Sequence, residues 1–289
     1  MEKMSKLKFR TLSVSQRIVY IVAFIITTAL TLSHLSVPVF AVIQGLKTHE
    51  EVVLTPFAWP TAWHFENYLE VFTLLQVGDT NFLGMTFNTL WYSIGSTFAT
   101  VAGTFCVTYI VSKYKFPGCS ALNIVAILVM IIPLASGSSA YKTIYTLGLN
   151  DSPLFLITKI GGLTGPYLLM KACIDGISWT YAEAAFLDGA SDFQVMHKII
   201  LPQLVAPIMA IVVNNLLVYW NSFEEPLLYL SELPMLSVGI KFFQNEMIYN
   251  VRMDILFAAC VISAIPLWVL YGLCNKTLLN VSFGGGLKG

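Results

Sequence analysis

Charged residues are scarce in this chain. Only 11% of its 289 residues are Asp, Glu, Lys or Arg, whereas 56% are hydrophobic. An average soluble domain has about 25% charged residues and roughly 45–50% apolar ones. The formal net charge is +0, so the chain has no excess of basic residues with which to bind nucleic acid. The composition therefore predicts an integral membrane protein in a lipid bilayer, without a nucleic-acid partner.

Cysteine clusters and nucleotide-binding motifs are also missing. The five cysteines have no metal-ligand spacing, so neither a zinc site nor a disulfide framework is expected: Cys106, Cys119, Cys173, Cys260 and Cys274. No G-x-x-x-x-G-K-[ST] run occurs, and no Ser-His or paired-Asp arrangement stands out. We therefore expect no catalytic residues, no cofactor and no metal in this chain, which is predicted not to be an enzyme.

Long apolar runs are the feature that the chain does have. A spanning helix needs about 20 mostly apolar residues. Six runs meet that length, and they predict an all-α integral membrane protein with six transmembrane helices. The expected spans are 18–44, 82–112, 119–141, 153–174, 199–223 and 255–275.

The first and fourth runs need separate arguments. The first is far longer than the roughly 7–15 apolar residues of a signal peptide, so it is interpreted as a retained helix. The fourth contains Lys159, whose burial at the bilayer centre would cost roughly 2.5–3.5 kcal/mol. We expect Lys159 near the outer end of the span, where its ammonium can reach the interface.

The distribution of Lys and Arg predicts the orientation. Short cytoplasmic loops carry an excess of these residues. The amino-terminal arm (1–17) has five of them, the second connection has Lys113 and Lys115, and the fourth connection is bracketed by Lys171 and Lys198. The connection 45–81 is instead acidic and is placed outside. Both the arm and the tail (276–289) are therefore expected in the cytoplasm, with the permease domain at 18–275.

The connection 179–199, with the residues just after it, contains the most informative pattern. Glu183-Ala184-Ala185 is followed after three residues by Gly189, then after nine by Ile199, and then by Leu201-Pro202. Thr180 with Glu183 and Ser191 with Gln194 have capping-box spacing, which predicts two short helices. Gly189 between them suits a left-handed helix end.

This spacing resembles the EAA loop of permease subunits of ATP-binding-cassette (ABC) importers. The resemblance implies a type I importer permease fold, in which a cytoplasmic coupling helix docks on a separate ATPase subunit. The residues that match the loop, and to which it assigns ATPase coupling, are Glu183, Ala184, Ala185, Asp188, Gly189, Ile199, Leu201 and Pro202.

Further matches point to a sugar importer. Trp220-Asn221-Ser222-Phe223 with Pro226-Leu227-Leu228 resembles the end of the fifth span in sugar permeases, and 236–240 and the glycine-rich tail resemble other parts of them. The chain is thus similar to the smaller permease subunit of maltose-type carbohydrate importers. Glu224-Glu225 departs from that pattern, which leaves charged or unusual glycans open.

The resemblance implies the following partners. They are a second permease subunit in a heteromeric pair, two ATPase subunits that bind ATP and Mg²⁺, and an extracytoplasmic solute-binding protein that delivers an oligosaccharide. The implied location is the bacterial cytoplasmic (inner) membrane.

Polar residues in the fifth span are candidates for the solute path. Amides offer hydrogen bonds and aromatic rings offer flat apolar faces to a sugar. The alternative is that Asn joins helices and that Trp or Tyr lies at the membrane interface. The candidates are Asn214, Asn215, Tyr219, Trp220 and Asn221.

Two other functions stay open. A permease for amino acids, phosphate or polyamines would share the coupling loop but not the sugar-like tail. A gradient-driven secondary transporter would need ion-binding breaks or buried carboxylates at mid-membrane, and the expected spans have none that is clearly central.

Overall fold

The computed structural model describes residues 13–114, 116–132, 137–163, 165–246 and 252–284. The chain forms two compact units. One unit consists of Met1–Val71 and Val251–Ile262, and the other of Phe72–Asn250 and Ser263–Gly289. The last long helix, α14 (Met253–Gly284), contributes to both.

The first unit is built around the helix α1 (Val14–Gly45), followed by α2 (His49–Leu54) and the start of α3 (Glu66–Leu74). Ser13 and Thr48 are the N-caps of α1 and α2, and each begins a complete capping box. In each box the N-cap side chain accepts from the backbone amide three residues later, and the side chain of that later residue accepts from the N-cap amide. Most of the apolar side chains of α1 are exposed within this chain. An apolar surface of this size requires lipid or protein to cover it.

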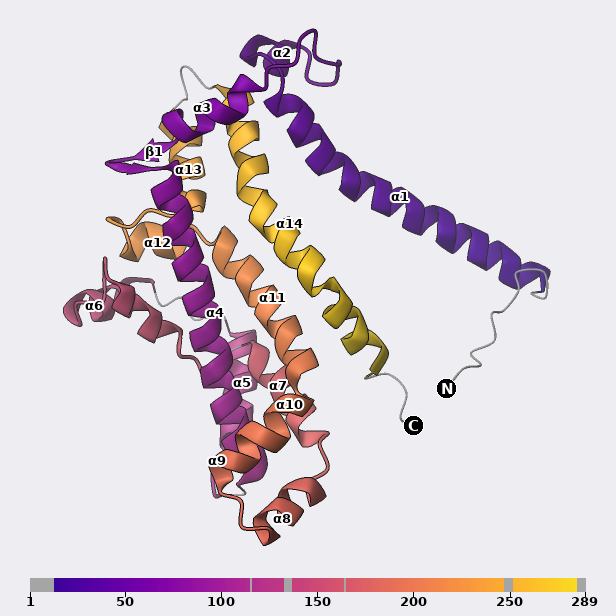
Figure 1. Ribbon diagram of the computed structural model, residues 1–289, viewed down its shortest axis with the longest axis vertical. Coiled ribbons are helices and arrows are strands. Elements are labelled where there is room, and N and C mark those ends of the chain that lie inside the picture. Colours follow the sequence, from indigo (N-terminus) through magenta and orange to yellow (C-terminus); the bar gives the residue numbers. More distant parts are fainter. Residues whose placement is uncertain (1–12, 115, 133–136, 164, 247–251, 285–289) are drawn as a thin grey trace. The chain divides into compact units, whose positions relative to one another are not determined.

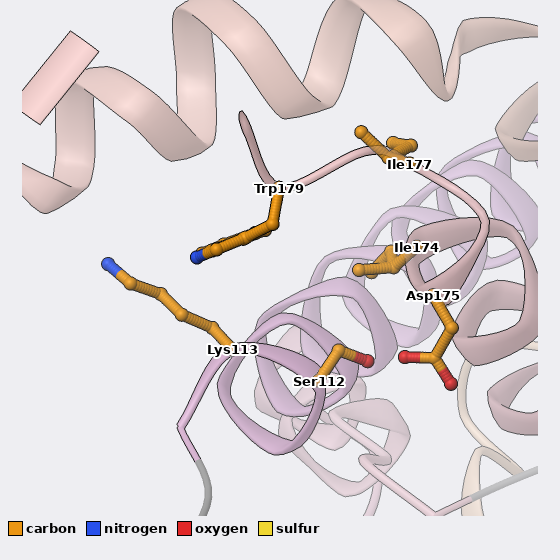
Figure 2. Close-up of a pocket in the computed structure, with 6 residues that line it drawn as sticks. All are labelled: Ser112, Lys113, Ile174, Asp175, Ile177 and Trp179. Atoms are coloured by element: carbon orange, nitrogen blue, oxygen red, sulfur yellow. The ribbon is translucent and has the colours of Figure 1, made fainter. Parts of the chain in front are cut away.

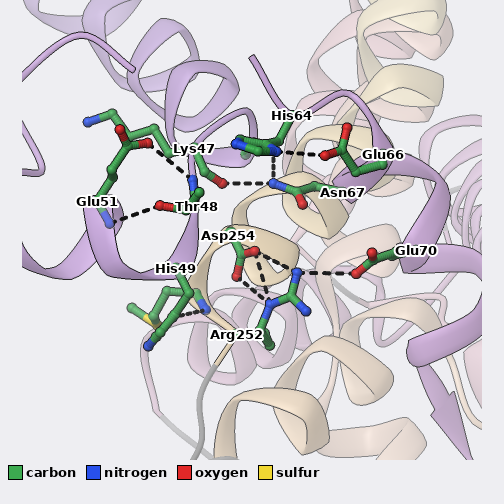
Figure 3. A network of polar contacts seen from close by, with 12 residues as sticks. Lys47, Thr48, His49, Glu51, His64, Glu66, Asn67, Glu70, Arg252 and Asp254 are labelled. Carbon is green, nitrogen blue, oxygen red and sulfur yellow. Dashed lines mark hydrogen bonds and ion pairs between the residues drawn. The ribbon is translucent and has the colours of Figure 1, made fainter. Parts of the chain in front are cut away.

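A polar network joins the end of α1, the start of α3 and the start of α14 in this unit (Figure 3). The Asn67 amide donates to the carbonyls of Gly45 and Lys47 at 3.0 and 2.8 Å. Arg252, just before α14, pairs with Asp254 at 2.8 Å and with Glu70 of α3 at 3.1 Å. These contacts connect segments that are up to 182 residues apart.

The second unit contains the remaining helices. It begins with a hairpin of two-residue strands, β1 (Gln76–Val77) and β2 (Thr80–Asn81), which the all-α prediction did not include. The helices that follow are α4 (Phe82–Lys113), α5 (Cys119–Ile131), α6 (Gly137–Thr146), the 3₁₀ helix η2 (Pro153–Lys159), α7 (Pro166–Asp175), α8 (Thr180–Leu187), α9 (Asp192–Val195), the π-helical turn η3 (Met196–Ile200), α10 (Leu201–Gln203), α11 (Val205–Asn221), α12 (Glu224–Tyr229) and α13 (Leu236–Glu246).

Helix α4 is the centre of this unit, and it packs against α11, α7 and η2 (Figure 1). Small hydroxyl residues form a buried stripe along it, which allows close helix approach: Thr89, Ser93, Ser96, Thr97, Thr100, Thr104 and Thr108. At Gly103 an added Cβ would come within 3.2 Å of the Gly161 carbonyl oxygen. The absence of a side chain there lets the segment after η2 lie directly on α4.

Within the part of the chain that the structure describes, three helices are long and apolar enough to cross a membrane. They are α1, α4 and the Met253–Cys274 part of α14, which match the first, second and sixth expected spans. The segment Asp192–Gln203 with α11 passes the same test as a pair bent by 77°, at the place of the fifth. Helix α14 continues to Gly284, beyond the expected end of its span at residue 275.

The third and fourth expected spans are not single described helices. In 119–141, α5 ends at Ile131 and α6 begins at Gly137, and residues 133–136 lie outside the described part. In 153–174, η2 ends at Lys159 and α7 begins at Pro166. The interval contains Gly161, Gly162 and Gly165, and glycine weakens a helix by about 0.8–1 kcal/mol per residue.

Candidate functional site

The predicted coupling loop folds into short helices as expected, but its first cap differs. Trp179, not Thr180, is the N-cap of α8, and no side chain caps that end. The Trp179 backbone already has helical angles, and its carbonyl accepts from the amides of Ala182 and Glu183 at 2.9 and 3.0 Å. The Thr180 hydroxyl accepts instead from Ser178 at 3.2 Å. The predicted Thr180–Glu183 capping box is therefore wrong.

The sharp turn at Gly189 is confirmed. Gly189 has a φ of +83°, the left-handed conformation that other residues adopt at a cost. The amide of Gly189 donates to the Phe186 carbonyl at 3.0 Å, and that of Ala190 to the Ala185 carbonyl at 2.9 Å. This pair of bonds is a Schellman motif, which satisfies the last carbonyls of α8.

The second half of the loop begins with the predicted capping box. The Ser191 hydroxyl accepts from the Gln194 amide at 3.4 Å, and the Gln194 side chain accepts from the Ser191 amide at 2.8 Å. The helix then widens to the π-helical turn η3 and bends at Leu204. Pro202 lies between these two features and lacks an amide hydrogen, as is common at helix kinks.

One side of the loop is anchored in the protein core. Ala182, Val195 and Ile200 are fully buried in a cluster that includes Phe105 of α4 and Met170 of α7. Small residues on α8 allow this contact. The loop therefore packs directly on two helices of the second unit.

The opposite side of the loop is exposed. Glu183, Ala184 and Asp188 are exposed, and so is Leu187, at 90%. Phe193 on α9 is 68% exposed. Of the remaining predicted coupling residues, Ala185, Ile199 and Leu201 are half-buried, and Gly189 and Pro202 are exposed. Exposed apolar residues beside charged ones are typical of a protein interface.

Lys113 links this loop to α4, a role that the sequence did not reveal. Its ammonium pairs with the Asp192 carboxylate at the start of α9, and its side chain is only 8% exposed. It also lies 4.6 Å from the ring centre of Phe186 in α8, and 4.7 and 5.5 Å from those of Tyr114 and Tyr109. One side chain thus contacts both short helices of the loop.

A pocket of about 410 Å³ lies beside this link. Its lining comes from the end of α4, the end of α7 and the start of the loop (Figure 2): Ser112, Lys113, Ile174, Asp175, Ile177 and Trp179. Ser112 and Asp175 face one another across it.

The five candidate path residues do not share one environment. Asn214 and Asn221 are exposed and lie seven residues apart, so both are on the same face of α11. Asn215 and Trp220 are buried, and the Trp220 indole donates to the Ser263 carbonyl at 3.1 Å. Tyr219 is half-buried, with its hydroxyl 2.8 Å from that of Thr100. The structure thus brings two of the five onto an open face.

Lys159 is placed differently from the sequence-based expectation. Its side chain is 9% exposed, and its ammonium pairs with the Glu225 carboxylate of α12. The prediction that Lys159 reaches solvent at the end of a span is therefore wrong. The partner is 66 residues away, so the sequence gave no local signal for it.

Metal-ligating side chains do not gather in the described part of the chain. Across residues 13–114, 116–132, 137–163, 165–246 and 252–284, no group of three His, Cys, Asp or Glu side chains is placed to hold a metal ion.

Comparison with known proteins gives consistent relatives, although no family model matches. The chain is 23% identical over 245 residues to the diacetylchitobiose uptake system permease protein NgcG of Streptomyces coelicolor, covering 80% of this chain and 77% of the relative. It is 27% identical over 238 residues to the maltodextrin transport system permease protein MdxG of Bacillus subtilis, covering 79% and 82%.

Solved structures give the same fold. A chain of a bacterial ABC transporter involved in import of the acidic polysaccharide alginate superposes with a TM-score of 0.75 at 20% identity, covering 92% of this chain and 98% of that one. A chain of the alginate transporter in complex with its pentasaccharide-bound periplasmic protein superposes with a TM-score of 0.61 at 18% identity, covering 91% and 94%. In sequence, this multi-pass membrane protein is similar to permease subunits of carbohydrate ABC transport systems, and its fold is that of ABC importer permease structures.

Proposed function

We propose that this chain is one of two permease subunits of an ATP-driven, binding-protein-dependent importer of oligosaccharides. The observation that carries the proposal is the loop 179–199, whose inner side is buried on α4 and α7 and whose outer side exposes Glu183, Ala184 and Leu187. Because one side of this loop is packed in the core and the other side is exposed, the loop is suited to transmit motion from a docked partner.

In the proposed topology the chain crosses the inner membrane six times. The Lys and Arg residues of the arm and of the loop at 113–115, and the two lysines that bracket 171–198, support a cytoplasmic position for both chain ends and for the coupling loop. The 3₁₀ and α-helical pieces between 153 and 175 would together form the fourth crossing. Irregular backbone is tolerated at membrane depth where protein surrounds it.

The proposed mechanism is mechanical. ATP and Mg²⁺ bind to two separate ATPase subunits, whose closure moves α8 and α9. The motion reaches α4 through Lys113 and Asp192, and it reaches α11 through the bend at Leu204. Because α4 and α11 pack against each other, the helices of the second unit would tilt together and open the path outward.

The relatives support a sugar as the solute. The named systems carry diacetylchitobiose and maltodextrin, and the alginate transporter was crystallised with a solute-bound periplasmic protein. We infer that an extracytoplasmic binding protein delivers the oligosaccharide here as well. Asn214 and Asn221, on the exposed face of α11, are the path candidates that the geometry favours most.

The coupling role is tested by uptake in the assembled transporter. Glu183→Lys and Gly189→Asp each place a wrong charge on the exposed side of the loop. Both variants should insert into the membrane at normal levels but abolish uptake and its coupling to ATP hydrolysis. Gly148→Asp is the matched control, because Gly148 also has a positive φ (+63°) and no atom within 4 Å of an added Cβ. Normal uptake by both loop variants would refute the coupling assignment.

A further inference from the structure

Two ionised side chains meet within the apolar second unit. Lys159 ends η2, and Glu225 lies in the first turn of α12. Their pairing brings together the two residues that are hardest to explain by sequence: a lysine in an expected span, and a glutamate that departs from the sugar-permease pattern. An ionisable residue inside a membrane domain is a functional-site candidate by default.

Aromatic rings enclose the lysine. Its ammonium lies 5.0 Å from the ring centre of Phe155, 5.6 Å from that of Tyr219 and 5.9 Å from that of Tyr92. Each ring can stabilise the cation through its π face. The lysine is thus held in place from several sides, and with 9% exposure it is not accessible to a solute.

The glutamate is held equally firmly but remains accessible. Its Oε2 accepts from Lys159 and from the Tyr92 hydroxyl at 3.0 Å. Within the described part of the chain, both of these bonds fall on Oε2, so Oε1 keeps its acceptor capacity. The Glu225 side chain is 46% exposed, compared with 9% for its partner. The pair therefore exposes Oε1 of a fixed Glu225 carboxylate, while the positive charge of Lys159 lies on the buried side.

Stability alone does not account for such a pair. The free-energy cost of removing two charges from water can match or exceed the gain from their attraction. Replacing such a pair with apolar residues is therefore often neutral or stabilising. A carboxylate held in one orientation beside aromatic rings is, however, a good acceptor for sugar hydroxyl groups. Tyr219, one of the candidate path residues, forms part of the same cluster.

We infer that Glu225, positioned by Lys159 and Tyr92, contacts the hydroxyl groups of a neutral oligosaccharide and disfavours anionic ones. The inference rests on the proposed function, because it requires the exposed edge of Glu225 to face the solute path. A uronic-acid chain would bring its own carboxylates toward Oε1, and like charges at short range repel. Lys159 cannot offset that repulsion by direct contact, since the rings and Glu225 cover it.

The experiment compares two probes of equal length on the complete transporter in lipid nanodiscs, without the binding protein. Saturation-transfer NMR is recorded on an equimolar mixture of maltotriose, which is neutral, and trigalacturonate, which is acidic. The wild type should saturate maltotriose preferentially. Glu225→Gln leaves the positive charge of Lys159 without its partner, so the ratio of acidic to neutral signal should rise by about tenfold or more.

The matched control is Glu224→Gln. Glu224 is the preceding residue of α12, is exposed, and has no hydrogen bond or ion pair with the residues that the structure describes. The Glu224→Gln variant has the same change in net charge as Glu225→Gln but keeps the partner of Lys159. Its ratio of trigalacturonate to maltotriose signal should therefore stay at the wild-type value. If Glu225→Gln fails to assemble, Lys159→Met/Glu225→Gln replaces it, since this double variant has no unpaired charge. In the double variant, the saturation signals of maltotriose and trigalacturonate should become nearly equal.

The outcomes separate the two claims. A wild-type ratio in Glu225→Gln, or in the double variant where that is used, overturns the inference. So does a wild type that saturates neither probe yet imports an oligosaccharide when its binding protein is present, because another subunit then covers Glu225. A transporter that imports no oligosaccharide at all overturns the proposed function itself.

Discussion

The ammonium of Lys113 pairs with the carboxylate of Asp192, so the last turn of α4 is tied to the first turn of α9. The same ammonium lies over the ring of Phe186 in α8. Lys113 therefore adds a polar attachment of both helices of the proposed coupling loop to α4, beside their apolar packing on Phe105. Motion of the loop cannot leave α4 unaffected while these contacts persist.

Replacing Lys113 with methionine should weaken coupling. The aliphatic stem is kept, but the ion pair and the cation–π contacts are lost. Coupling free energies between sites are typically about 1–3 kcal/mol, or about 5–150-fold. We expect solute taken up per ATP hydrolysed to fall at least about fivefold. The measurement is simultaneous uptake and ATPase activity in proteoliposomes.

Lys171→Met provides the comparison for Lys113→Met. Lys171 pairs with Asp175 at 2.5 Å within α7 itself, so its loss does not detach the loop. Such exposed i,i+4 pairs contribute about 0.3–0.5 kcal/mol. Reversing the pair, as Lys113→Asp/Asp192→Lys, should restore part of the coupling. Equal effects of the Lys113 and Lys171 changes would contradict the attachment role.

Gly189 should tolerate asparagine better than valine. The residue has a left-handed φ of +83°, which costs most residues about 1–2 kcal/mol but costs asparagine less. No atom lies within 4 Å of an added Cβ, so side-chain volume is not the obstacle. Uptake by Gly189→Asn should remain near normal, while Gly189→Val should lose most of it.

The aspartate variant at the same position separates shape from charge. Asn and Asp have nearly the same size, so any difference between Gly189→Asn and Gly189→Asp reports the effect of a negative charge on docking. If uptake by Gly189→Val equals uptake by Gly189→Asn, the left-handed turn is dispensable.

The sequence predicted the parts of the loop that depend on near neighbours. The turn at Gly189 and the Ser191–Gln194 box each require residues within five positions, and both were predicted correctly. The predicted Thr180–Glu183 capping box does not form, although the two residues have the required spacing. Trp179 adopts helical angles, so the first turn begins one residue earlier and Thr180 is already inside it.

Contacts between distant segments could not be predicted. Lys113 and Lys159 entered the sequence analysis only as charges to be placed near membrane surfaces. Their partners, Asp192 and Glu225, are 79 and 66 residues away, and no period or motif connects them. Helix length was predictable for α1 and α4, whose apolar runs are uninterrupted, whereas α14 continues past the predicted end at residue 275. It was not predictable for 153–174, where glycines end η2 early.

The Glu51 carboxylate should make the first unit sensitive to acid. It accepts from the Thr61 hydroxyl, from the Thr61 amide at 3.0 Å and from the Thr48 amide at 3.3 Å. Hydrogen bonds from Thr61 are the main reason why the pKa of Glu51 lies below its ordinary value. A lowered folded-state pKa means that the stabilisation is present above the unfolded pKa of about 4.3 and is lost as pH falls through the folded value.

Hydrogen exchange measures this directly. After correction for intrinsic rates, protection of the amides of Thr48 and Thr61 should be constant from pH 7 to about 5 and should fall below about pH 4. Glu51→Gln should remove that step, because it cannot titrate. Glu50→Gln, one residue earlier and exposed, should keep it. A step of the same size in Glu51→Gln would assign the acid sensitivity to another group.

Arg252 should be essential for the stability of the first unit. Its guanidinium donates to Asp254 at 2.8 and 3.0 Å to Oδ2 and at 3.1 Å to Oδ1, and the Asp254 side chain is only 2% exposed. Arg252→Met would leave that carboxylate buried without its main partner, and breaking one side of a buried pair costs about 3–5 kcal/mol. We expect the first-turn amides of α14 to lose protection by hundreds-fold in hydrogen exchange.

Two further variants distinguish charge burial from packing. Glu70→Gln removes the other, half-exposed carboxylate that pairs with Arg252, and an exposed pair contributes only about 0–1 kcal/mol. Arg252→Met/Asp254→Asn removes both charges and should regain much of the protection lost by the single change. If the double variant is no better than Arg252→Met, the arginine acts through its packing contacts, and the unpaired carboxylate is not the cause of the loss.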